Sequence, residues 1–541
     1  MPHRLMGLET EFCVRCSSPS PFAHRPTKKD VCLAILRAVD RVVPAAPGNR
    51  AGEPHFQHFV QNGGAFSFEV VPIGSNDGLL ESATPECRGA SQLLLYQRAQ
   101  EAVIQRALPL ARARLAARGF DVDLAVVKNS RDADGHVFGT QENYEVQIAR
   151  GWRLLLYRSG LAVLLPVIAL LLVLSVIAGV LAILVIAAMA LVFPAARHYF
   201  RGFDQDSSPL SRGGDLRSDC PPGFLRVSAV ITMAVASPVA LSFLLLLRLT
   251  AFHAIRSRGM AFLVTRQVVT GAGTLHDDGR FGLSERAESF SSTIRTSVRQ
   301  RSRSLFDTAN LLKRLFMNDG IVRSVTGLFS RRQRLQLGSS DSNCAQTAEF
   351  LKVGVTSLVL DMIEAGFLDN APRVLRPVKA LKQISRDPTL RTRVAVADGG
   401  SMTALELQRW YLRRAEAYLS SERVASLESW EIVRLWRTTL QALEHDPFSL
   451  VGRIDWVTKH VLMADADTLG HAARKKIDIK YHEIGSGYFA MLERRGLAPV
   501  RLSSRDVREA IFHPPEDTPA WERGESIRLA GNSRTQMRVQ W

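Results

Sequence analysis

Cysteine is scarce in this chain: only six of the 541 residues are cysteines. Cys13 and Cys16 form a single CxxC, and the absence of a second pair at metal-ligand spacing excludes the common four-cysteine zinc framework. Two ordinary thiols beside a strand are therefore favoured over a zinc or redox pair. The low cysteine content is typical of a reducing, cytosolic environment for the soluble part of the protein.

The sequence also has no nucleic-acid-reading motif, no internal repeat and no low-complexity linker. Its first residues, MPHRLMGLETEF, lack the apolar h-region of a signal peptide, so we expect no cleavable signal. The 69 Lys and Arg exceed the 52 Asp and Glu and give a net charge of +17, which favours anionic partners such as nucleotides, acidic proteins or lipid headgroups. Because the basic residues are scattered, binding of nucleic acid is disfavoured.

Charged residues are missing from two long apolar runs in the middle of the chain, 161–193 and 227–247. Both exceed the roughly 20 residues that a helix needs to cross a bilayer core. The first run is long enough for one tilted helix, or for two short ones that turn near Pro166 or Gly179. The flanking arginines do not decide the orientation.

These runs predict a transmembrane hairpin, residues 155–256, inserted into a soluble protein. If the residues before and after the insertion build one domain, both parts lie on the same side, and the number of crossings is even. We expect two crossings, with residues 194–226 as an external loop. The predicted location is the inner membrane, multi-pass, with the catalytic domain facing the cytoplasm.

The stretch GLETEF near the start alternates apolar and acidic residues. In a β-strand, Glu9 and Glu11 project from the same face about 7 Å apart. Two like charges on one face are unfavourable unless water or a cation compensates them. Taken alone, this strand is best interpreted as an edge strand with a solvated outer face.

Further acidic residues follow on expected strands: Glu69 ends FSFE, Glu81 and Glu86 lie in LLESATPEC, and Glu142 begins the strand of QENYEVQI. Several strand-borne carboxylates in one antiparallel array, within a strongly basic protein, indicate a cradle for a divalent metal and a nucleotide. Mg²⁺ fits because proteins hold it with a few carboxylates plus phosphates.

The order of these motifs resembles that of the Pup ligase and depupylase family, whose ligase is proteasome accessory factor A. The family is related to glutamine synthetase and the carboxylate–amine ligases. The resemblance covers nearly the whole chain except the apolar insertion. Its motifs are MGLETEF, NGG…FSFE, ESATPEC, KNSRDADG…GTQENY, FLVTRQVVTGAG, LSERAE, SSDSNCAQTAEFLKVGVTSLVLDMIEAG, IDWVTKHVLM, IDIKYHEIGSGYF and PPEDTPAWERGE.

The resemblance implies an α+β fold of the glutamine synthetase type, with a curved antiparallel sheet backed by helices. Residues 1–154 and 257–445 are expected to form the catalytic domain, and residues 446–541 a small C-terminal domain that closes over the nucleotide. The implied activity is ATP-dependent formation of an isopeptide bond. ATP phosphorylates the side-chain carboxylate of the C-terminal glutamate of a small disordered modifier, and a substrate lysine attacks the acyl phosphate. Mg²⁺ neutralises charge on the phosphoryl group.

Carried over by motif, Glu9 and Glu81 would ligate the metal, and Glu11 would support the same cluster. Glu69 stands where the family has its aspartate base, which deprotonates the lysine. This replacement keeps the charge and extends the reach by one methylene. A misplacement of about 1 Å can cost about a hundredfold in rate.

For the nucleotide, the motif positions predict contacts from Thr84, Arg266, Arg523 and Trp541. Arg286, Arg334 and Lys352 are further candidates for the phosphates. The chain also departs from the family pattern: an ATP-contacting arginine and a metal-site tyrosine are replaced by Ala65 and Ser67, and the family's HEN triplet reads Gln-Glu-Asn at 141–143. Each lost arginine removes a charge-assisted phosphate contact.

The predicted partners are a Pup-like modifier, lysine-bearing protein substrates and the membrane. Three functions stay open: a membrane-anchored ligase, a depupylase- or deamidase-type hydrolase on the same scaffold, and a catalytically inactive membrane adaptor. Depupylases carry a long loop soon after the first strand. The segment from Cys16 to Gln61 is shorter than that loop, which favours the ligase branch.

Overall fold

The computed structural model describes residues 4–18, 25–48, 56–70, 78–128, 131, 137–192, 238–239, 241–294, 303–307, 326–421, 425–464, 466 and 468–532. The chain divides into two compact units. The first combines the described residues up to Ile148 with those from Phe252 onwards, and the described part of the second lies within Ala149–Ala251, close to the predicted insertion 155–256. Residues 446–541, predicted as a small C-terminal domain, belong to the first unit.

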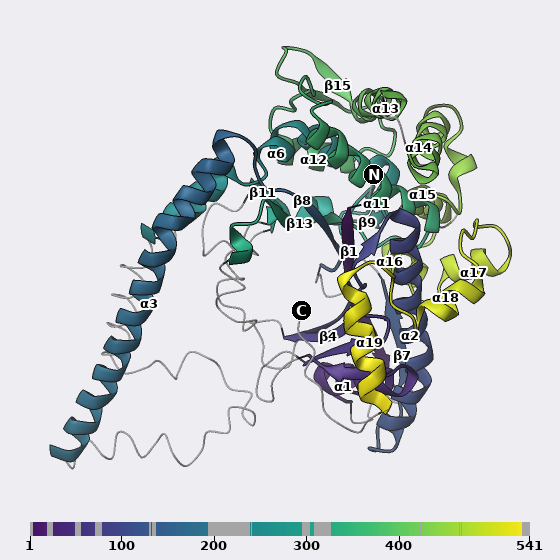
Figure 1. Ribbon diagram of the computed structural model, residues 1–541. Helices are drawn as coiled ribbons and strands as arrows, with labels where there is room; N and C mark the ends of the chain where they lie inside the picture. Colours follow the sequence, from purple (N-terminus) through teal and green to yellow (C-terminus); the bar gives the residue numbers. More distant parts are fainter. Residues whose placement is uncertain are drawn as a thin grey trace. The chain divides into compact units, whose positions relative to one another are not determined.

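The first unit is built on an eleven-stranded sheet with the order β11-β12-β13-β8-β1-β5-β4-β3-β2, in which β6 and β7 also pair with β1 (Figure 1). All pairs are antiparallel except β11 with β12. The strands are β1 (Leu5–Ser17), β2 (Ala45–Pro47), β3 (Phe56–Val60), β4 (Ala65–Val70), β5 (Gly78–Ala83), β6 (Cys87–Arg88), β7 (Asp123–Val127), β8 (Thr140–Gln147), β11 (Phe290–Ile294), β12 (Arg303–Asp307) and β13 (Arg332–Ser340).

Strand β1 shows why one face of the sheet is covered. Leu8, Thr10 and Phe12 are buried and alternate with the acidic positions of GLETEF, as the period of a strand requires. The same alternation places Phe66 and Leu80, which are both buried, on this covered face through the pairing of β1, β5 and β4. The covered face is therefore largely apolar on β1, β4 and β5, with Thr10 and Ser82 as buried polar residues.

Helices α1 (Lys28–Val42), α2 (Ala90–Ala116) and α11 (Gln346–Ala365) pack on this face. Helices α13 (Ala404–Ser421) and α14 (Leu427–His445) form a further layer on α11 (Figure 1). The other described helices of this unit are α6 (His253–Arg258), α7 (Met260–Thr265), α8 (Gln267–Thr270), η1 (Arg286–Ser289), α12 (Pro377–Ser385), η3 (Pro447–Leu450), α15 (Asp455–Ala464), α16 (His471–Tyr481), α17 (Tyr488–Arg494), α18 (Ser504–Ala510) and α19 (Pro519–Asn532). Two small hairpins pair β9 (Thr274–Leu275) with β10 (Phe281–Gly282) and β14 (Arg393–Ala395) with β15 (Ser401–Thr403).

The N-terminus of α2 is hydrogen-bonded to α14 and so connects the two helical layers. Glu428 of α14 accepts hydrogen bonds from the backbone N–H groups of Ala90 and Ser91, at 3.1 and 2.8 Å, and so satisfies donors that a helix N-terminus leaves open. Gly89 precedes them at φ 88°, where a Cβ would come within 2.7 Å of the Glu428 carboxylate. Glycine is needed at this position for both reasons.

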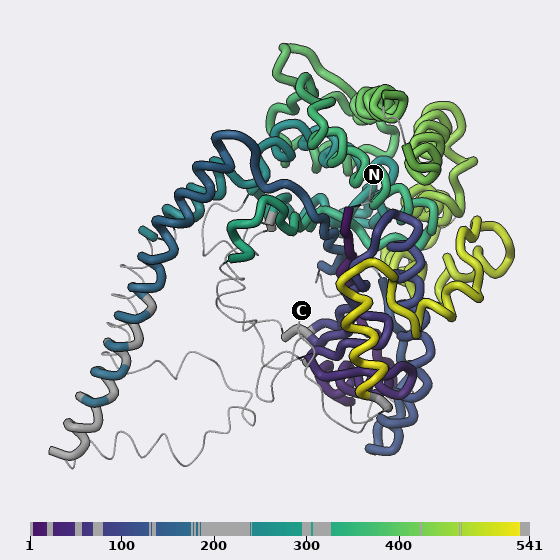
Figure 2. The backbone as a smooth tube through the Cα atoms, viewed as in Figure 1, coloured from purple at the N-terminus to yellow at the C-terminus, as the bar shows by residue number. Residues whose placement is uncertain are grey.

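Figure 2 shows that distant parts of the sequence meet in one sheet: the purple N-terminal strand β1 and the teal strand β13, which begins at Arg332, flank β8. The prediction of an α+β fold with a large sheet backed by helices is confirmed. Its antiparallel character holds for all pairs but one.

The second unit contains one long helix, α3 (Trp152–Val192), which continues through Pro166 and Gly179 without a turn. Within the described residues, only this helix is long and apolar enough to cross a membrane. The described residues of the second apolar run are 238–239 and those of a shorter apolar helix, Leu241–Thr250, which does not reach the length of a crossing within the described residues. The predicted transmembrane hairpin is therefore not supported. Residues 227–237 and 240 of the second run lie outside the described residues.

Candidate active site

The open face of the sheet gathers the acidic residues that the sequence singles out. Glu11 stands directly opposite Glu81 in the pairing of β1 with β5, and Glu9 lies two residues from Glu11 on the same face. Position 67 stands opposite Glu81 in the next pair, so position 69 shares this face too. Strand register thus brings positions 9, 11, 69 and 81, from three strands, onto one surface.

The strands at the other edge of β1, β8 and β13, add uncharged polar side chains and an arginine to the same face of the sheet. Gln141 of β8 pairs with Glu9, and Asn143 of β8 pairs with Gln336 of β13. Arg334 lies two residues from Gln336 and therefore on the same face. We call the described residues Glu9, Glu11, Glu81, Gln141, Asn143, Arg334 and Gln336 the polar face.

Each of two polar-face carboxylates is bound by one arginine and one glutamine. Glu9 forms a short ion pair with Arg334 and accepts a hydrogen bond from Gln336 Nε2 at 3.2 Å. Glu11 accepts from Gln141 Nε2 at 3.3 Å and from Arg286 at 3.4 Å.

These contacts join into one chain. Gln336 also donates to the side-chain oxygen of Gln141, and Arg334 Nε donates to Asn143 Oδ1 at 2.7 Å. A continuous series of polar contacts therefore runs across β13, β8 and β1, from Asn143 to Arg286. The two carboxylates are charge-compensated within it.

Arg286 reaches Glu11 from the short helix η1 and is held firmly. Its side chain is only 2% exposed, and its Nε donates to the carbonyl of Gly338 at 2.9 Å. Its backbone N–H donates to Asp341 at 3.1 Å. Its guanidinium passes over Gly139, where a Cβ would come within 2.6 Å of it. This glycine is therefore required by the arginine above it.

Asp341 lies beneath this arginine and accepts a second hydrogen bond from the backbone N–H of Ala272 at 2.9 Å. Burial raises the pKa of Asp341 to about 6, although these hydrogen bonds favour the charged form. The residue joins two loops behind the polar face, and sequence reasoning missed it.

The predicted nucleotide contact Thr84 has a different place. Its side chain is buried, and its hydroxyl oxygen accepts the backbone N–H of Leu8 at 3.0 Å. The Thr84 backbone N–H in turn donates to the Leu8 carbonyl at 2.9 Å. In this structure Thr84 joins the segment after β5 to β1.

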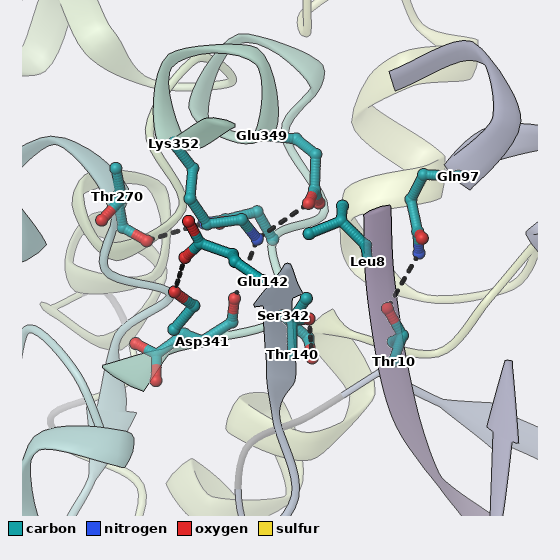
Figure 3. Close-up of polar contacts among 12 residues, drawn as sticks. Leu8, Thr10, Gln97, Thr140, Glu142, Thr270, Asp341, Ser342, Glu349 and Lys352 are labelled. Atoms are coloured by element: carbon teal, nitrogen blue, oxygen red, sulfur yellow. Dashed lines mark hydrogen bonds and ion pairs between the residues drawn. The ribbon is translucent and has the colours of Figure 1, made fainter. Parts of the chain in front are cut away.

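Arg266 lies behind the sheet, and this differs from its predicted role as a nucleotide contact. Its guanidinium is bound to Glu142 at 2.7 and 2.9 Å and to the hydroxyl of Thr356 in α11 at 2.8 Å. Glu142 alternates with Gln141 along β8 and so belongs to the helix-covered face, where its carboxylate also accepts a hydrogen bond from the Ser340 hydroxyl. Figure 3 shows Glu142 beside Asp341 and Lys352. Because both charges are buried and paired, Arg266 is held away from the polar face.

Arg523 and Trp541 complete the predicted nucleotide set. Arg523, in α19, donates to the Gly63 carbonyl at 2.6 and 2.9 Å and forms an ion pair with Glu86. It therefore connects the C-terminal helix to the turn between β3 and β4. Trp541 lies outside the described residues, and the side chain of Glu69 is likewise not described.

A second buried network, which sequence reasoning also missed, backs the sheet. Lys128 contacts Glu101 of α2 at 2.5 Å and Glu349 of α11 at 3.3 Å. Lys352 pairs with Glu349 at 2.7 Å, as Figure 3 shows. Burial alone would raise the pKa of Glu101, but Arg98 and Lys128 lower it to about 2. The spacing of these charged residues in the sequence does not indicate that their side chains are buried. Their burial becomes evident only from the packing of α2 against α11.

Whether this site suits the predicted Mg²⁺ depends on its donors. Among the described residues, no three histidine, cysteine, aspartate or glutamate side chains are grouped so that they could hold a metal ion. Proteins usually bind Mg²⁺ through one or two carboxylates together with phosphate oxygens and water. The polar-face carboxylates Glu9, Glu11 and Glu81 therefore fit a magnesium ion that shares its ligands with a nucleotide, and not one held by protein groups alone.

Sequence relatives of this chain are described as Pup–protein ligases. The proteins from Mycobacterium tuberculosis and Mycobacterium bovis are each 28% identical over 553 residues, and that from Mycobacterium leprae is 28% identical over 552 residues. Each alignment covers 100% of this chain and 93% of the relative.

Solved structures share the fold. The crystal structure of the complex between the prokaryotic ubiquitin-like protein Pup and its ligase PafA matches with a TM-score of 0.66 at 22% identity, over 100% of this chain and 86% of that chain. The Pup ligase PafA in complex with ADP matches with a TM-score of 0.59 at 22% identity, over 95% of this chain and 88% of that chain.

The family model described as Pup-ligase protein matches residues 4–541, which is nearly the entire chain. The resemblance stated from the motifs is thereby confirmed. The match also includes the apolar insertion and the departures at positions 65 and 67. This chain belongs to the Pup-ligase family.

Proposed function

We propose that this chain is a membrane-anchored, ATP-dependent ligase that joins the C-terminal glutamate of a small Pup-like modifier to lysine side chains of proteins. The prediction of an ATP-dependent ligase of this family is confirmed by the family match and the ligase relatives. The observation that carries the finer proposal is the strand register, which sets positions 9, 11, 69 and 81 on one face.

The chemistry proceeds in two steps. The γ-carboxylate of the modifier attacks the terminal phosphorus of ATP, which forms an acyl phosphate and releases ADP. The lysine amine then attacks the acyl carbon, so that the C–N bond forms and inorganic phosphate leaves. Magnesium, a prediction for this chain, would supply charge neutralisation during phosphoryl transfer.

The chain's own residues have three tasks in this reaction. Arg334 is the arginine of the polar face, and its side chain, which is 38% exposed, is accessible to attract the phosphates. Glu9, Glu11 and Glu81 are the proposed metal ligands. Glu69 is the proposed base, because a lysine ammonium has no lone pair until a proton is removed from it.

The ligase is separated from its alternatives by one reaction. Purified full-length chain in detergent is incubated with ATP, MgCl₂, a lysine-bearing protein and a modifier candidate, namely a short disordered protein ending in Glu encoded nearby. Mass spectrometry is expected to find the modifier joined to lysine with loss of water, and ADP formation in parallel. Release of modifier from a preformed conjugate, with no ligation, would favour the hydrolase. If the chain neither binds nor hydrolyses ATP, the inactive membrane adaptor would be the remaining function.

Membrane anchoring is part of this proposal, and α3 supports it. Its 41 residues span about 60 Å, twice the roughly 30 Å of a bilayer core. Along it, large apolar side chains such as Val163, Leu170 and Leu184 are more than half exposed to solvent. An apolar surface of this length is stable only when lipid or protein covers it.

The strand pairing constrains the topology. β8 ends before the second unit, β13 follows it, and the two pair along their length, so the segments on either side of α3 fold together. If α3 is anchored in a membrane, the number of crossings must therefore be even, and we propose that the catalytic unit faces the cytoplasm. The test is alkaline carbonate extraction of membranes from the native organism, followed by protease treatment of sealed vesicles. Release of the chain by carbonate would overturn the anchoring.

A further inference from the structure

The two best candidates for metal ligands are already neutralised by arginine. On the polar face, Glu9 is paired with Arg334 and Glu11 with Arg286. Two carboxylates and two guanidinium groups leave no net charge in this set. Within these two pairs, neither carboxylate is a bare anionic site for a free cation, and neither guanidinium is bare for a free nucleotide.

The two ion pairs differ in how easily they exchange partners. Arg286 and Glu11 are 2% and 6% exposed, and Arg286 is further held by the Gly338 carbonyl. Arg334 and Glu9 are 38% and 19% exposed, and the other contacts of both are with neutral amide side chains. Water and ligands reach the outer pair, so Arg334 and Glu9 are the pair that can open.

Opening this pair for one ligand alone is unfavourable. A cation that binds Glu9 leaves the Arg334 guanidinium without a counter-ion. A triphosphate that binds Arg334 leaves the Glu9 carboxylate without a counter-ion. In a partly buried site, a charge that loses its partner is not fully compensated by water. A magnesium–triphosphate complex brings both charges together and supplies a new partner to each residue.

We propose that the Arg334–Glu9 pair is an exchangeable counter-ion lock that admits metal and nucleotide only as a complex. This inference rests on the proposed function, because it takes a nucleoside triphosphate as the ligand of the polar face. On binding, Glu9 would exchange the Arg334 guanidinium for the metal, and Arg334 would exchange the Glu9 carboxylate for a phosphate. Free Mg²⁺ and metal-free nucleotide are both excluded.

The same strands offer a matched control. Arg332 lies two residues from Arg334 on the same face of β13, and it pairs with Glu145 of β8 at 3.4 Å. Both partners are exposed, at 49% and 37%. Arg332→Gln removes the same charge by the same substitution from the same strand, but outside the lock.

The test measures binding, and not turnover, with full-length chain in detergent. Isothermal titration uses the non-hydrolysable analogue AMP-PNP with MgCl₂ or with EDTA, and Mn²⁺ alone is followed by electron paramagnetic resonance. For the wild-type chain we expect AMP-PNP to bind at least tenfold more weakly in EDTA than with MgCl₂, and Mn²⁺ alone to bind weakly.

The two lock variants are expected to change ligand affinity in different ways: one strengthens binding of metal-free nucleotide, and the other strengthens binding of free metal. Glu9→Gln frees Arg334, so metal-free AMP-PNP is expected to bind at least fivefold more tightly than to wild type. Arg334→Gln frees Glu9, so Mn²⁺ alone is expected to bind more tightly while nucleotide binding falls. Arg332→Gln is expected to match wild type in all titrations. Thermal melting confirms that each variant is folded.

Two results would overturn the lock. One is equal affinity of the wild-type chain for AMP-PNP with and without Mg²⁺. The other is a Glu9→Gln variant, folded by melting, whose metal-free affinity is unchanged. Absence of nucleotide binding under every condition would instead overturn the proposed function, and the lock with it.

Discussion

The two faces of one sheet use the same pair of residue types in opposite ways. On the helix-covered face, Arg266 and Glu142 are 3% and 1% exposed, and serine, threonine and tyrosine hydroxyls satisfy their remaining hydrogen bonds. On the open face, Arg334 and Glu9 meet within reach of solvent. The first pair is closed to any ligand, whereas the second can change partners. Burial, and not residue type, separates an arginine that holds the fold from one that is available to a substrate.

This comparison also explains why the open face needs support from behind. The backbone N–H of Arg286 is fixed by Asp341, and β8 carries Gln141 on one face and the buried Glu142 on the other. A disturbance of the covered face is therefore expected to shift the donors of the open face. The reverse effect is expected to be smaller, because Arg334 and Glu9 are partly exposed and their other contacts are with polar-face amides.

The largest effect is expected at the proposed base. Glu69→Ala is predicted to lower ligation by about 10²–10⁴-fold, the usual contribution of general base catalysis, and to leave the fold intact. The measurement is single-turnover isopeptide formation, with thermal melting as the control. Unchanged turnover in the folded variant would refute the assignment of the base.

The buried pair gives the sharpest test of the two faces. Arg266→Met leaves the buried Glu142 carboxylate without its ion-pair partner, so it is expected to lower the free energy of unfolding by about 3–5 kcal/mol. Arg334→Met on the open face is expected to lower it by less than about 1 kcal/mol. Urea denaturation followed by tryptophan fluorescence measures both. The double variant Arg266→Met/Glu142→Leu should recover most of the loss. Equal costs for the two single variants would break the comparison.

The stability of the fold is expected to fall at low pH because of Glu101 of α2, on the helix-covered side of the sheet. The pKa of Glu101 is lowered to about 2 in the folded chain, from an ordinary value near 4.5, so its contribution of about 3 kcal/mol is fully present above pH 4.5 and is lost as the pH falls towards 2. The measurement is unfolding free energy against pH for wild type and Glu101→Gln. A variant with an unchanged acid slope would contradict this assignment.

The smallest effect is expected at the junction between the faces. Gly139→Ala places a Cβ within 2.6 Å of the Arg286 guanidinium and forces the arginine away from Glu11. Overpacking of this kind costs about 1–3 kcal/mol. Denaturation measures the cost, and AMP-PNP titration shows whether the polar face is disturbed as well. The matched control is Gly338→Ala, since nothing lies within 4 Å of a Cβ there.

Much of the site was predictable from the sequence. The alternation in GLETEF and the motif order place Glu9, Glu11, Glu69 and Glu81 in one acidic array, and the strand register sets these four positions on one face. Their roles as metal ligands and base stay predictions. The role of Arg266 was not predictable from its motif, because an arginine in a sequence gives no sign of which carboxylate it meets. One signal was present: Glu142 alternates with Gln141 and Asn143, so it had to face the covered side and needed a cation there.

The sequence by itself determined the family, the fold class and the long apolar segment, because these depend on local periodicity and motif order, which the linear chain records. Only the tertiary structure decided which arginine meets which glutamate, that α3 is one continuous helix, and that Thr84 and Arg523 connect backbone segments. These outcomes depend on strand register and on which face is covered. Both are set by contacts between residues that lie far apart in the chain.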